Sequence, residues 1–211
     1  MQEVQAVFVD CDGVLYDVDL LTYEEMVSAC KNAACELGLN LDNFDEVRAN
    51  LKQKGFHGLY NTILKLCQAQ NKSFEKIADR MVQLLDYSRI LPNPELLDLL
   101  QQVGKRRKLY IFTNNTHAHL NRIFKCLFDK NLAQSGINAI TIENTYSDGF
   151  FHPKRMPNIF TSWCQKIGVL PQNTLMLDDT DNVIQAAKEQ GLQYQQIQSA
   201  RMTQEILQEL L

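Results

Sequence analysis

The stretch Val7-Phe8-Val9-Asp10-Cys11-Asp12-Gly13-Val14-Leu15-Tyr16-Asp17 decides how this chain is interpreted. Its three leading apolar residues, two of them β-branched, predict a buried strand that ends at Asp10. Gly13 allows the chain to turn sharply directly afterwards. Ligands of open α/β sheets bind at the carboxyl ends of the strands, so the sequence places Asp10 and Asp12 at a candidate active site.

The spacing of these two aspartates suits a division of labour. Residues two apart in an extended segment point the same way, so one carboxylate can attack a substrate while the other moves protons. Taken alone, the pattern Asp-x-Asp-Gly is short, and it is also typical of a solvated turn after a strand. Its interpretation therefore depends on the rest of the chain.

Length and composition exclude several classes of protein. The 211 residues suffice for one α/β domain with an insertion. A net charge of −4 gives no electrostatic sign of nucleic-acid binding, and the six cysteines form no Cys-x-x-Cys pair. No apolar run reaches the length of a membrane span, and the first predicted strand leaves no room for a secretory signal. We expect a cytoplasmic protein with neither a membrane nor a nucleic-acid partner.

Strand-like and helical patterns alternate along much of the chain. Strands are expected at 4–9, 109–112, 137–142, 174–177 and 193–197. A helix is expected before the second of these strands, with Asn93 as its N-cap, Pro94 at its first position and Gly104 just past its end. This alternation predicts an α/β fold, a Rossmann-like parallel sheet flanked by helices with right-handed crossovers.

The segment 18–90 interrupts this alternation, because its pattern is helical throughout. Helices are expected at about 22–37, 44–54, 58–70 and 73–87. About 70 residues are too many for one crossover, so we predict an all-helical cap domain at 18–90 and a core catalytic domain formed by 1–17 and 91–211. Such a cap could exclude water and select substrates. The alternative is that these helices simply pack on one face of the sheet.

Three further polar sites lie where the first pair of aspartates would need help. Thr113-Asn114 follows a predicted strand, and a hydroxyl with backbone N–H groups at such a turn can hold phosphate oxygens. Lys154 lies just ahead of a predicted helix. Asp178-Asp179 ends another predicted strand, and two adjacent aspartates at that place are hard to explain as helix caps.

These sites together give an argument from charge. The carboxylates of Asp10 and Asp12 would meet those of Asp178 or Asp179 at one edge of the sheet, where partial desolvation makes them repel one another. A hard divalent cation would neutralise them, and Mg²⁺ prefers carboxylate oxygens and water. Lys154 would add a further positive charge. Such a site suits phosphoryl transfer, in which positioning and charge neutralisation dominate.

The four sites, in this order, resemble the motifs of the haloacid dehalogenase-like superfamily of phosphohydrolases, over residues 7–191. The first motif of that family matches Asp10-Cys11-Asp12-Gly13, and the second matches Thr113. The third motif matches Lys154, and the fourth matches Asp178-Asp179. Four motifs in the right order are far more specific than one.

The resemblance implies roles for individual residues. Asp10 would be the nucleophile that forms an aspartyl-phosphate. Asp12 would protonate the leaving oxygen and then activate water for hydrolysis of that intermediate. The residues that would hold the phosphoryl group are Thr113, Asn114 and Lys154.

The resemblance also implies a Mg²⁺ site, held by Asp10, the backbone carbonyl of Asp12, and Asp178 or Asp179. We favour Asp179 over Asp178. One departure from the family pattern is Arg155, because the family usually has proline directly after the lysine of its third motif.

Within the superfamily, the chain is most similar to the pyrimidine 5′-nucleotidase subgroup, which carries a helical cap after the first motif. The supporting stretches are 12–16, 54–59 and 91–94. His119 and Arg122 also stand at the subgroup's spacing from Thr113-Asn114, although we expect structural roles for both. The cap residues considered as candidates to face the site are Arg48, Phe56, His57 and Tyr60.

The sequence therefore predicts an enzyme, a Mg²⁺-dependent phosphatase acting on a small phosphate monoester, with a nucleoside 5′-monophosphate as the leading candidate. Two alternatives stay open. One is a sugar-phosphate or phosphoglycolate-type phosphatase, and the other is a catalytically weak or regulatory binding module of the same fold. The resemblance makes Asp12 an argument against a dehalogenase, which lacks a carboxylate at this position.

Overall fold

A five-stranded parallel sheet forms the centre of the molecule, with the strand order β3-β2-β1-β6-β7. The computed structural model describes residues 3–56 and 58–211. The strands are β1 (Ala6–Val9), β2 (Lys108–Phe112), β3 (Asn138–Ile140), β6 (Thr174–Asp178) and β7 (Gln193–Gln196). All five expected strands are present, and the predicted α/β fold is confirmed.

Strand β1 is central and completely buried, as its uninterrupted apolar sequence requires in a parallel sheet covered on both faces. Alternation along the strand sends Val7 and Val9 to one face and Phe8 to the other. Val7 and Val9 join the larger hydrophobic cluster, whereas Phe8 packs with Phe112 and Phe160 in the smaller one.

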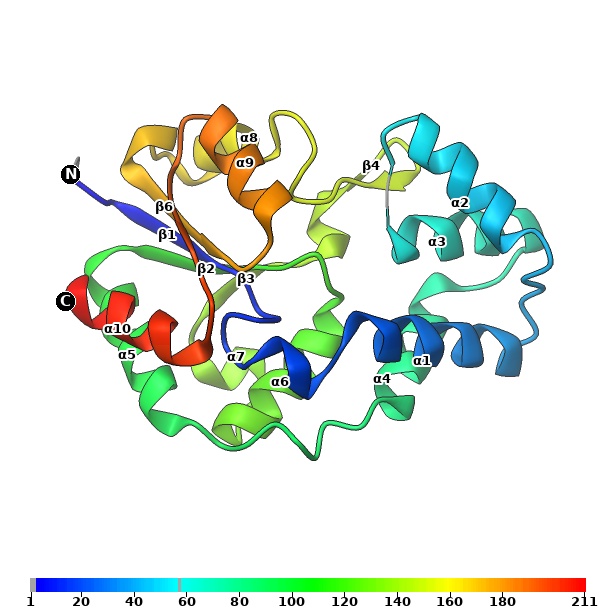
Figure 1. The fold of residues 1–211 in the computed structure, drawn as a ribbon, viewed down its shortest axis with the longest axis horizontal. Coiled ribbons are helices and arrows are strands. Elements are labelled where there is room, and N and C mark those ends of the chain that lie inside the picture. Colours follow the sequence, from blue (N-terminus) through cyan, green and yellow to red (C-terminus); the bar gives the residue numbers. More distant parts are fainter. Residues whose placement is uncertain (1–2, 57) are drawn as a thin grey trace.

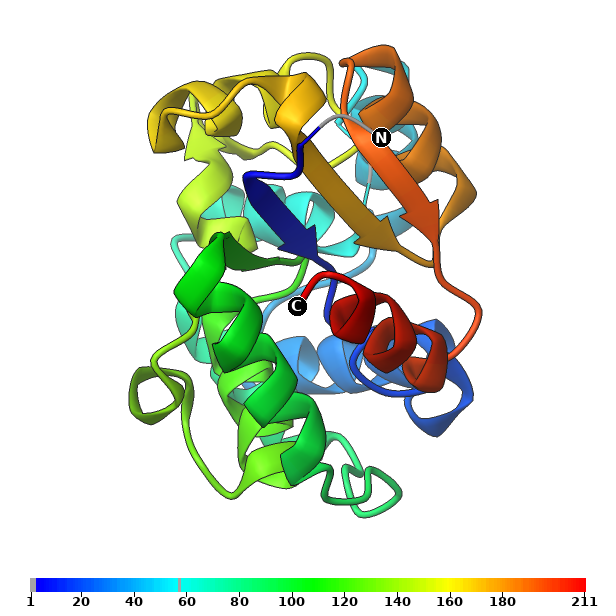
Figure 2. The same ribbon diagram turned by 90° about the vertical axis from the view of Figure 1, so that its left-hand side faces the viewer.

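Helices cover both faces of the sheet (Figure 2). The helices of the core region are α5 (Pro94–Arg106), α6 (His117–Phe128), α7 (Leu132–Ser135), α8 (Ile159–Ile167), α9 (Asp181–Glu189) and α10 (Ala200–Glu209). Helices α5, α6 and α10 contribute to the larger hydrophobic cluster, and α8 and α9 contribute to the smaller one. The expected start of α5 is confirmed, since the Asn93 side chain accepts a hydrogen bond from Leu96 N–H at 3.2 Å and Pro94 opens the helix.

The expected end of helix α5 is wrong. The helix continues through Gly104 to Arg106 and ends where Arg107 becomes extended. Gly104 does not have a positive φ, so it is an ordinary helical residue and not a cap. Lys105 and Arg106 occupy the last turn, where cations interact favourably with the carbonyl end of the helix.

The segment between β1 and α5 contains a short 3₁₀ turn (Val18–Leu20) and four helices. These are α1 (Tyr23–Glu36), α2 (Phe44–Gln53), α3 (Leu59–Gln70) and α4 (Phe74–Leu84). They lie on the side toward which β1 points (Figure 1), and the described part of this segment contains no strand of the sheet.

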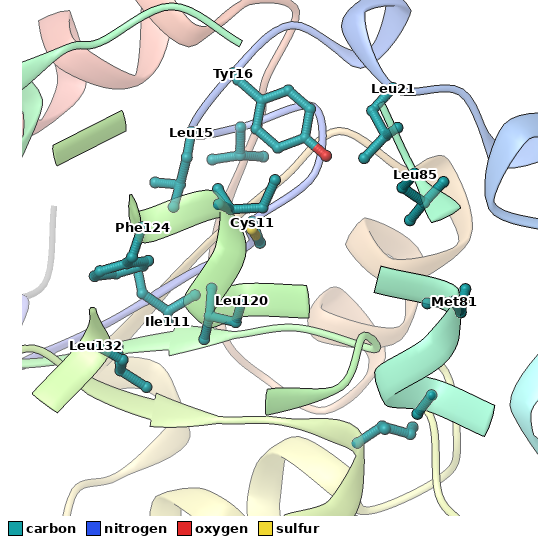
Figure 3. Close-up of a cluster of buried hydrophobic side chains, with 14 of the residues drawn as sticks. Cys11, Leu15, Tyr16, Leu21, Met81, Leu85, Ile111, Leu120, Phe124 and Leu132 are labelled. Atoms are coloured by element: carbon teal, nitrogen blue, oxygen red, sulfur yellow. The ribbon is translucent and has the colours of Figure 1, made fainter. Parts of the chain in front are cut away.

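The larger hydrophobic cluster runs without a break from the sheet into this helical segment. Its members include Leu15 and Tyr16 after β1, Leu21 at the start of the segment, and Met81 on α4 (Figure 3). A shared core of this kind restricts how far the helices can move as a separate body. The division into a cap at 18–90 and a core domain stays a proposal.

A small antiparallel hairpin, which was not predicted, joins the sheet region to the helical segment. Its strands are β4 (Tyr146–Ser147) and β5 (Phe150–Phe151), connected by Asp148-Gly149 with φ of 53° and 79°. Two positive φ angles are typical of a type I′ hairpin turn. Asn61 on α3 pairs with the Phe151 backbone in both directions at 2.9 Å, so the hairpin is fastened to the helical segment.

None of the helices in the described part of the chain is both long and apolar enough to cross a bilayer.

Candidate active site

A cleft of about 460 Å³ opens where the carboxyl ends of the strands meet helices α1 and α3. The strand ends contribute Asp10, Asp12, Asn114 and Asp179, among others. The helical segment contributes Tyr23, Met26 and Tyr60. The position agrees with the rule that open α/β sheets bind ligands beyond the carboxyl ends of their strands.

Lys154 lies beneath this cleft as a buried cation between two carboxylates. Its side chain is 1% exposed, its Nζ lies 2.8 Å from Asp10 Oδ1, and it donates a hydrogen bond to Asp178 Oδ2. The backbone N–H of Lys154 donates to Asn114 Oδ1 at 2.8 Å. Two strand ends and the loop before α8 therefore converge, as the sequence predicted for Asp10, Lys154 and Asp178.

The charges of Asp10, Asp178 and Lys154 together favour the binding of a cation beside them. Burial raises the pKa of Asp10 well above its usual value, and the charges of Asp178 and Asp12 add to the effect against the attraction of Lys154. Burial alone would lower the pKa of Lys154, but Asp10 and Asp178 hold that pKa above its ordinary value. The lysine stays protonated, and the carboxylates around it are in excess.

Three carboxylates here have the arrangement of a metal site. Asp10, Asp178 and Asp179 each offer an oxygen, and these oxygens lie within 4.8 Å of one another. Both carboxylate oxygens of Asp178 already accept hydrogen bonds, Oδ1 from the Thr180 N–H at 2.9 Å and Oδ2 from the Lys154 ammonium group. Asp179 lines the cleft, and burial followed by the charge of Asp178 raises its pKa. The donor set is hard oxygen, which suits Mg²⁺.

Gly13 makes room for Asp179. Its φ is +74°, and a Cβ built on it would lie 2.5 Å from Asp179 Oδ2. A side chain at position 13 would therefore both strain the turn and push Asp179 out of place. This contact gives the glycine of the first motif a physical reason.

Asp12 lies outside this carboxylate group and is held by hydrogen bonds on both oxygens. Its Oδ1 accepts from Tyr16 and lies 2.9 Å from His119 Nε2, and its Oδ2 accepts from Asn115 Nδ2 at 2.5 Å. Burial opposes the charged form, but the charge of His119 and the three hydrogen bonds lower the pKa of Asp12 to about 2. Asp12 is therefore ionised in this arrangement.

The residues that hold Asp12 are in turn held by tyrosines from the helical segment and from the connection to α5. His119 is completely buried, and its Nδ1 lies 3.0 Å from the Tyr87 hydroxyl. The Tyr60 hydroxyl on α3 donates to Asn115 Oδ1 at 2.6 Å. Sequence reasoning missed Asn115 and expected a structural role for His119, although the spacing of His119 from Thr113 was a signal for it.

Thr113 and Asn114, two of the predicted phosphate-binding residues, differ in their position relative to the cleft. Thr113 is 1% exposed at the end of β2 and does not line the cleft. Its Oγ1 accepts the N–H of Asn115 at 3.0 Å, so it orders the turn that carries Asn115. Asn114 does line the cleft, and its side chain bonds to the Lys154 backbone.

Among the proposed cap candidates, Tyr60 lines the cleft. Phe56 stacks on Phe150 of the hairpin, with ring centroids 4.0 Å apart, and Arg48 is exposed on α2 and is not part of the cleft lining. His57 lies outside the described residues. Arg122 places its guanidinium over the Tyr87 ring, 5.6 Å from the centroid, which agrees with the structural role expected for it.

The sequence as a whole decides the family. A family model described as haloacid dehalogenase-like hydrolase matches residues 4–191. The chain belongs to this family. The match covers every motif on which the resemblance rested, and it makes the protein a haloacid dehalogenase-like hydrolase. None of the curated proteins compared matches the chain.

Solved structures with the same fold include three bacterial hydrolases or related enzymes. A haloacid dehalogenase family enzyme from Bacteroides thetaiotaomicron, in complex with magnesium and inorganic phosphate, is 19% identical over 92% of this chain and 93% of that chain, with a TM-score of 0.53. CbbY from Rhodobacter sphaeroides, in complex with phosphate, is 18% identical over 90% and 84%, with a TM-score of 0.58. A hydrolase from Pseudomonas syringae is 20% identical over 97% and 90%, with a TM-score of 0.56. At these identities the likeness establishes the fold.

Proposed function

We propose that this haloacid dehalogenase-like hydrolase is a Mg²⁺-dependent phosphatase that hydrolyses a small phosphate monoester through an aspartyl-phosphate. One observation carries the proposal: Asp10, Lys154, Asp178 and Asp179 come from three separate regions of the chain and converge beside one cleft. Gathering four charged side chains at one sheet edge costs folding free energy, and such clusters are typical of sites that bind a ligand or catalyse a reaction.

The residues present fit a magnesium ion. Asp10 Oδ1 is buried without a hydrogen-bond partner in the described chain apart from its ion pair with Lys154, and it belongs to the three-carboxylate group. Asp10, the backbone carbonyl of Asp12, and Asp179 or Asp178 would hold the ion. Bound there, Mg²⁺ would neutralise the carboxylates and the phosphate charge.

In the first half of the proposed reaction, a carboxylate oxygen of Asp10 attacks phosphorus. A bond forms between that oxygen and phosphorus, and the bond from phosphorus to the ester oxygen breaks. Lys154 keeps Asp10 in place and offsets its charge. Asp12 would give a proton to the leaving oxygen, which requires that its hydrogen bonds to Tyr16, His119 and Asn115 first admit a proton on the carboxyl group.

In the second half, water attacks the aspartyl-phosphate, its proton passes to Asp12, and Asp10 is released as a carboxylate. The ionised Asp12 of the structure is the form that this half needs. Asn114, at the cleft wall, and Lys154 would hold the phosphoryl oxygens, while Thr113 would act through the turn that it orders.

Two classes of phosphate ester are candidate substrates for this reaction. The subgroup resemblance supports a nucleoside 5′-monophosphate, and the cleft has room and apolar walls for a nucleobase beside Met26, Tyr60 and Phe151. A sugar phosphate is the second candidate, because a mutant of CbbY, which shares the fold, has been crystallised with xylulose-1,5-bisphosphate.

The proposed function is tested by phosphate release from p-nitrophenyl phosphate and from a panel of nucleotides and sugar phosphates. We expect turnover with Mg²⁺ and none with excess EDTA. The Asp10→Asn variant should lose about a thousandfold or more in rate, because an amide cannot replace the nucleophile. The exposed Asp181→Asn variant is the matched control and should keep wild-type rates. Wild-type rates in Asp10→Asn would refute the nucleophile assignment.

A further inference from the structure

Arg155 directly follows Lys154, but the two side chains lie in different surroundings. Lys154 is buried against Asp10 and Asp178, whereas Arg155 is partly exposed and lines the cleft. Of the described residues that line the cleft, Arg155 is the one cationic residue. The two adjacent cations therefore lie in different surroundings: Lys154 contacts buried carboxylates, and Arg155 lines the cleft.

One donor of the Arg155 guanidinium lacks a hydrogen-bond acceptor among the described residues. Its Nε is buried and has no hydrogen-bond partner within the described part of the chain. None of the ion pairs formed there includes Arg155. A buried donor without an acceptor costs free energy, and an arginine offers a planar fork of donors that matches a carboxylate or a phosphate. An anion bound in the cleft would supply the acceptor that the described residues do not.

Arg155 shares the cleft lining with Tyr23 and Met26 of α1, which belong to the helical segment. Burial lowers the pKa of Arg155 and Tyr23 partly offsets this, but an arginine stays charged at any physiological pH. A substrate whose phosphoryl group lay against Asp10 would extend its leaving group along the rest of this lining, which includes Arg155.

Position 155 is also where this chain departs from its family, which usually has proline there. Proline offers no donor to a ligand, so the arginine adds a chemical capability and does not simply preserve the loop. Asn114 and the Lys154 backbone fix the loop independently of residue 155.

We propose that Arg155 forms a subsite for a second anionic group of the substrate, a carboxylate or a second phosphate on the leaving group. The inference rests on the proposed phosphatase function and narrows its substrate to doubly anionic esters. A neutral leaving group would leave the guanidinium without an acceptor, so the subsite favours the acidic members of the sugar-phosphate class over simple nucleosides.

Turnover of matched esters tests the subsite. The pairs are ω-carboxyalkyl phosphates and alkanediol bisphosphates, each against the hydroxyalkyl phosphate of equal chain length. We expect wild-type kcat/KM to favour one of the charged series, and Arg155→Gln to lower the ratio of charged to neutral about 10- to 100-fold, mostly through KM. Arg155→Lys should keep part of the ratio. The exposed Arg201→Gln variant is the control and should keep all of it.

The two charged series identify the source of the anion, because only one of them should lose its advantage if the subsite is selective. An equal loss on charged and neutral esters in Arg155→Gln would mean that Arg155 serves the phosphoryl group or the fold, and would overturn the subsite. No loss on either series would overturn it as well. Thermal melting of each variant separates loss of folding from loss of recognition.

Binding without turnover separates this inference from the proposed function. Calorimetric titration with Mg²⁺ compares ω-carboxyalkyl and alkanediyl bis-phosphonates with plain alkyl phosphonates, none of which can be hydrolysed at the phosphorus–carbon bond. We expect wild type to prefer a charged phosphonate and Arg155→Gln to lose that preference. If no ester is hydrolysed but the preference is present, the phosphatase proposal fails and the anion subsite stands. Equal affinity of wild type for charged and neutral phosphonates would sink the subsite.

Discussion

Asp12 shows how single residues of this site are tuned by their neighbours. Its carboxylate accepts hydrogen bonds from Tyr16, His119 and Asn115, and its pKa falls from 3.8 to about 2. A depressed carboxyl pKa stabilises the folded state above the unfolded pKa, and this contribution is lost as the pH falls toward the folded pKa. The shift corresponds to about 2 kcal/mol of stability at neutral pH.

We therefore expect Asp12→Asn to lower the free energy of unfolding by about 2 kcal/mol at pH 7, with the difference from wild type shrinking as the pH falls from 4 toward 2. Urea unfolding across this range, with EDTA present, measures it. Asp98→Asn removes an exposed carboxylate and should change stability by less than about 0.5 kcal/mol at any of these pH values. A difference that stays constant with pH would contradict the assignment of the shift to Asp12.

Gly13 carries a second prediction at this scale. Replacing it by alanine adds a Cβ 2.5 Å from Asp179 Oδ2 at a φ of +74°. We expect Gly13→Ala to lose about 1–2 kcal/mol from backbone strain alone, together with most of the Mg²⁺ affinity. Gly136→Ala is the control, because its φ is +70° but a Cβ there would meet nothing within 4 Å. Equal Mg²⁺ affinity in both variants would show that Asp179 is not displaced.

Sequence alone could place Asp10 and Asp178 together, because each ends or directly follows an apolar strand and parallel strands bring such ends to one edge. Lys154 was identified from its place before a predicted helix and from the family resemblance, since a single lysine carries little signal of its own. The sequence could not reveal the hydrogen bonds around Asp12. Asn115 and His119 bond directly to Asp12 and are themselves held by Tyr60 and Tyr87, which lie far away in the chain and carry no local pattern. Side-chain networks of this kind depend on tertiary packing, which periodicity does not encode.

At the scale of elements, the strands and most helices were predictable because their apolar residues follow the period of the element. Helix α3, for example, was expected at 58–70 and is found at Leu59–Gln70. The hairpin β4–β5 was missed because strands of two residues carry no alternation, although Asp148-Gly149 is a turn signal. The end of α5 was misplaced because Gly104 is compatible with a helix interior.

The link between α3 and β5 gives a prediction at this scale. Asn61 is 2% exposed, and both polar atoms of its amide bond to the Phe151 backbone. Asn61→Ala leaves a buried N–H and a buried C=O without partners, so we expect a loss of about 2–4 kcal/mol in unfolding free energy. Gln68→Ala, which removes an exposed and longer contact from the same helix to Gly149, should cost much less. Equal losses would mean that the Asn61 pair does not fasten the hairpin.

At the scale of the whole molecule, the sheet edge that carries Asp10, Asp178 and Asp179 gathers negative charge, and this charge lowers the stability of the metal-free fold. Asp10, Asp178 and Asp179 lie close together, and the pKa values of Asp10 and Asp179 are raised, so the metal-free fold holds carboxylates that repel one another at neutral pH. A ligand that binds the folded state alone raises its stability in proportion to the logarithm of ligand concentration. Mg²⁺ should therefore stabilise the entire cooperative unit, because one hydrophobic cluster joins the sheet to the helical segment.

We expect Mg²⁺ at about a hundred times its dissociation constant to add about 3 kcal/mol, which raises the melting temperature by roughly 5–10 °C in a chain of this size. Asp179→Asn should melt at or above the wild-type temperature in EDTA, because a repelling charge is gone, and it should lose most of the rise with Mg²⁺. Asp181→Asn, two residues further on and exposed, should keep the full rise. If Asp179→Asn responds to Mg²⁺ like wild type, the ion is held by Asp178 instead. Asp178→Asn would then lose the rise in melting temperature with Mg²⁺. That variant should also be less stable in EDTA, because it removes one of the two carboxylates paired with the buried Lys154.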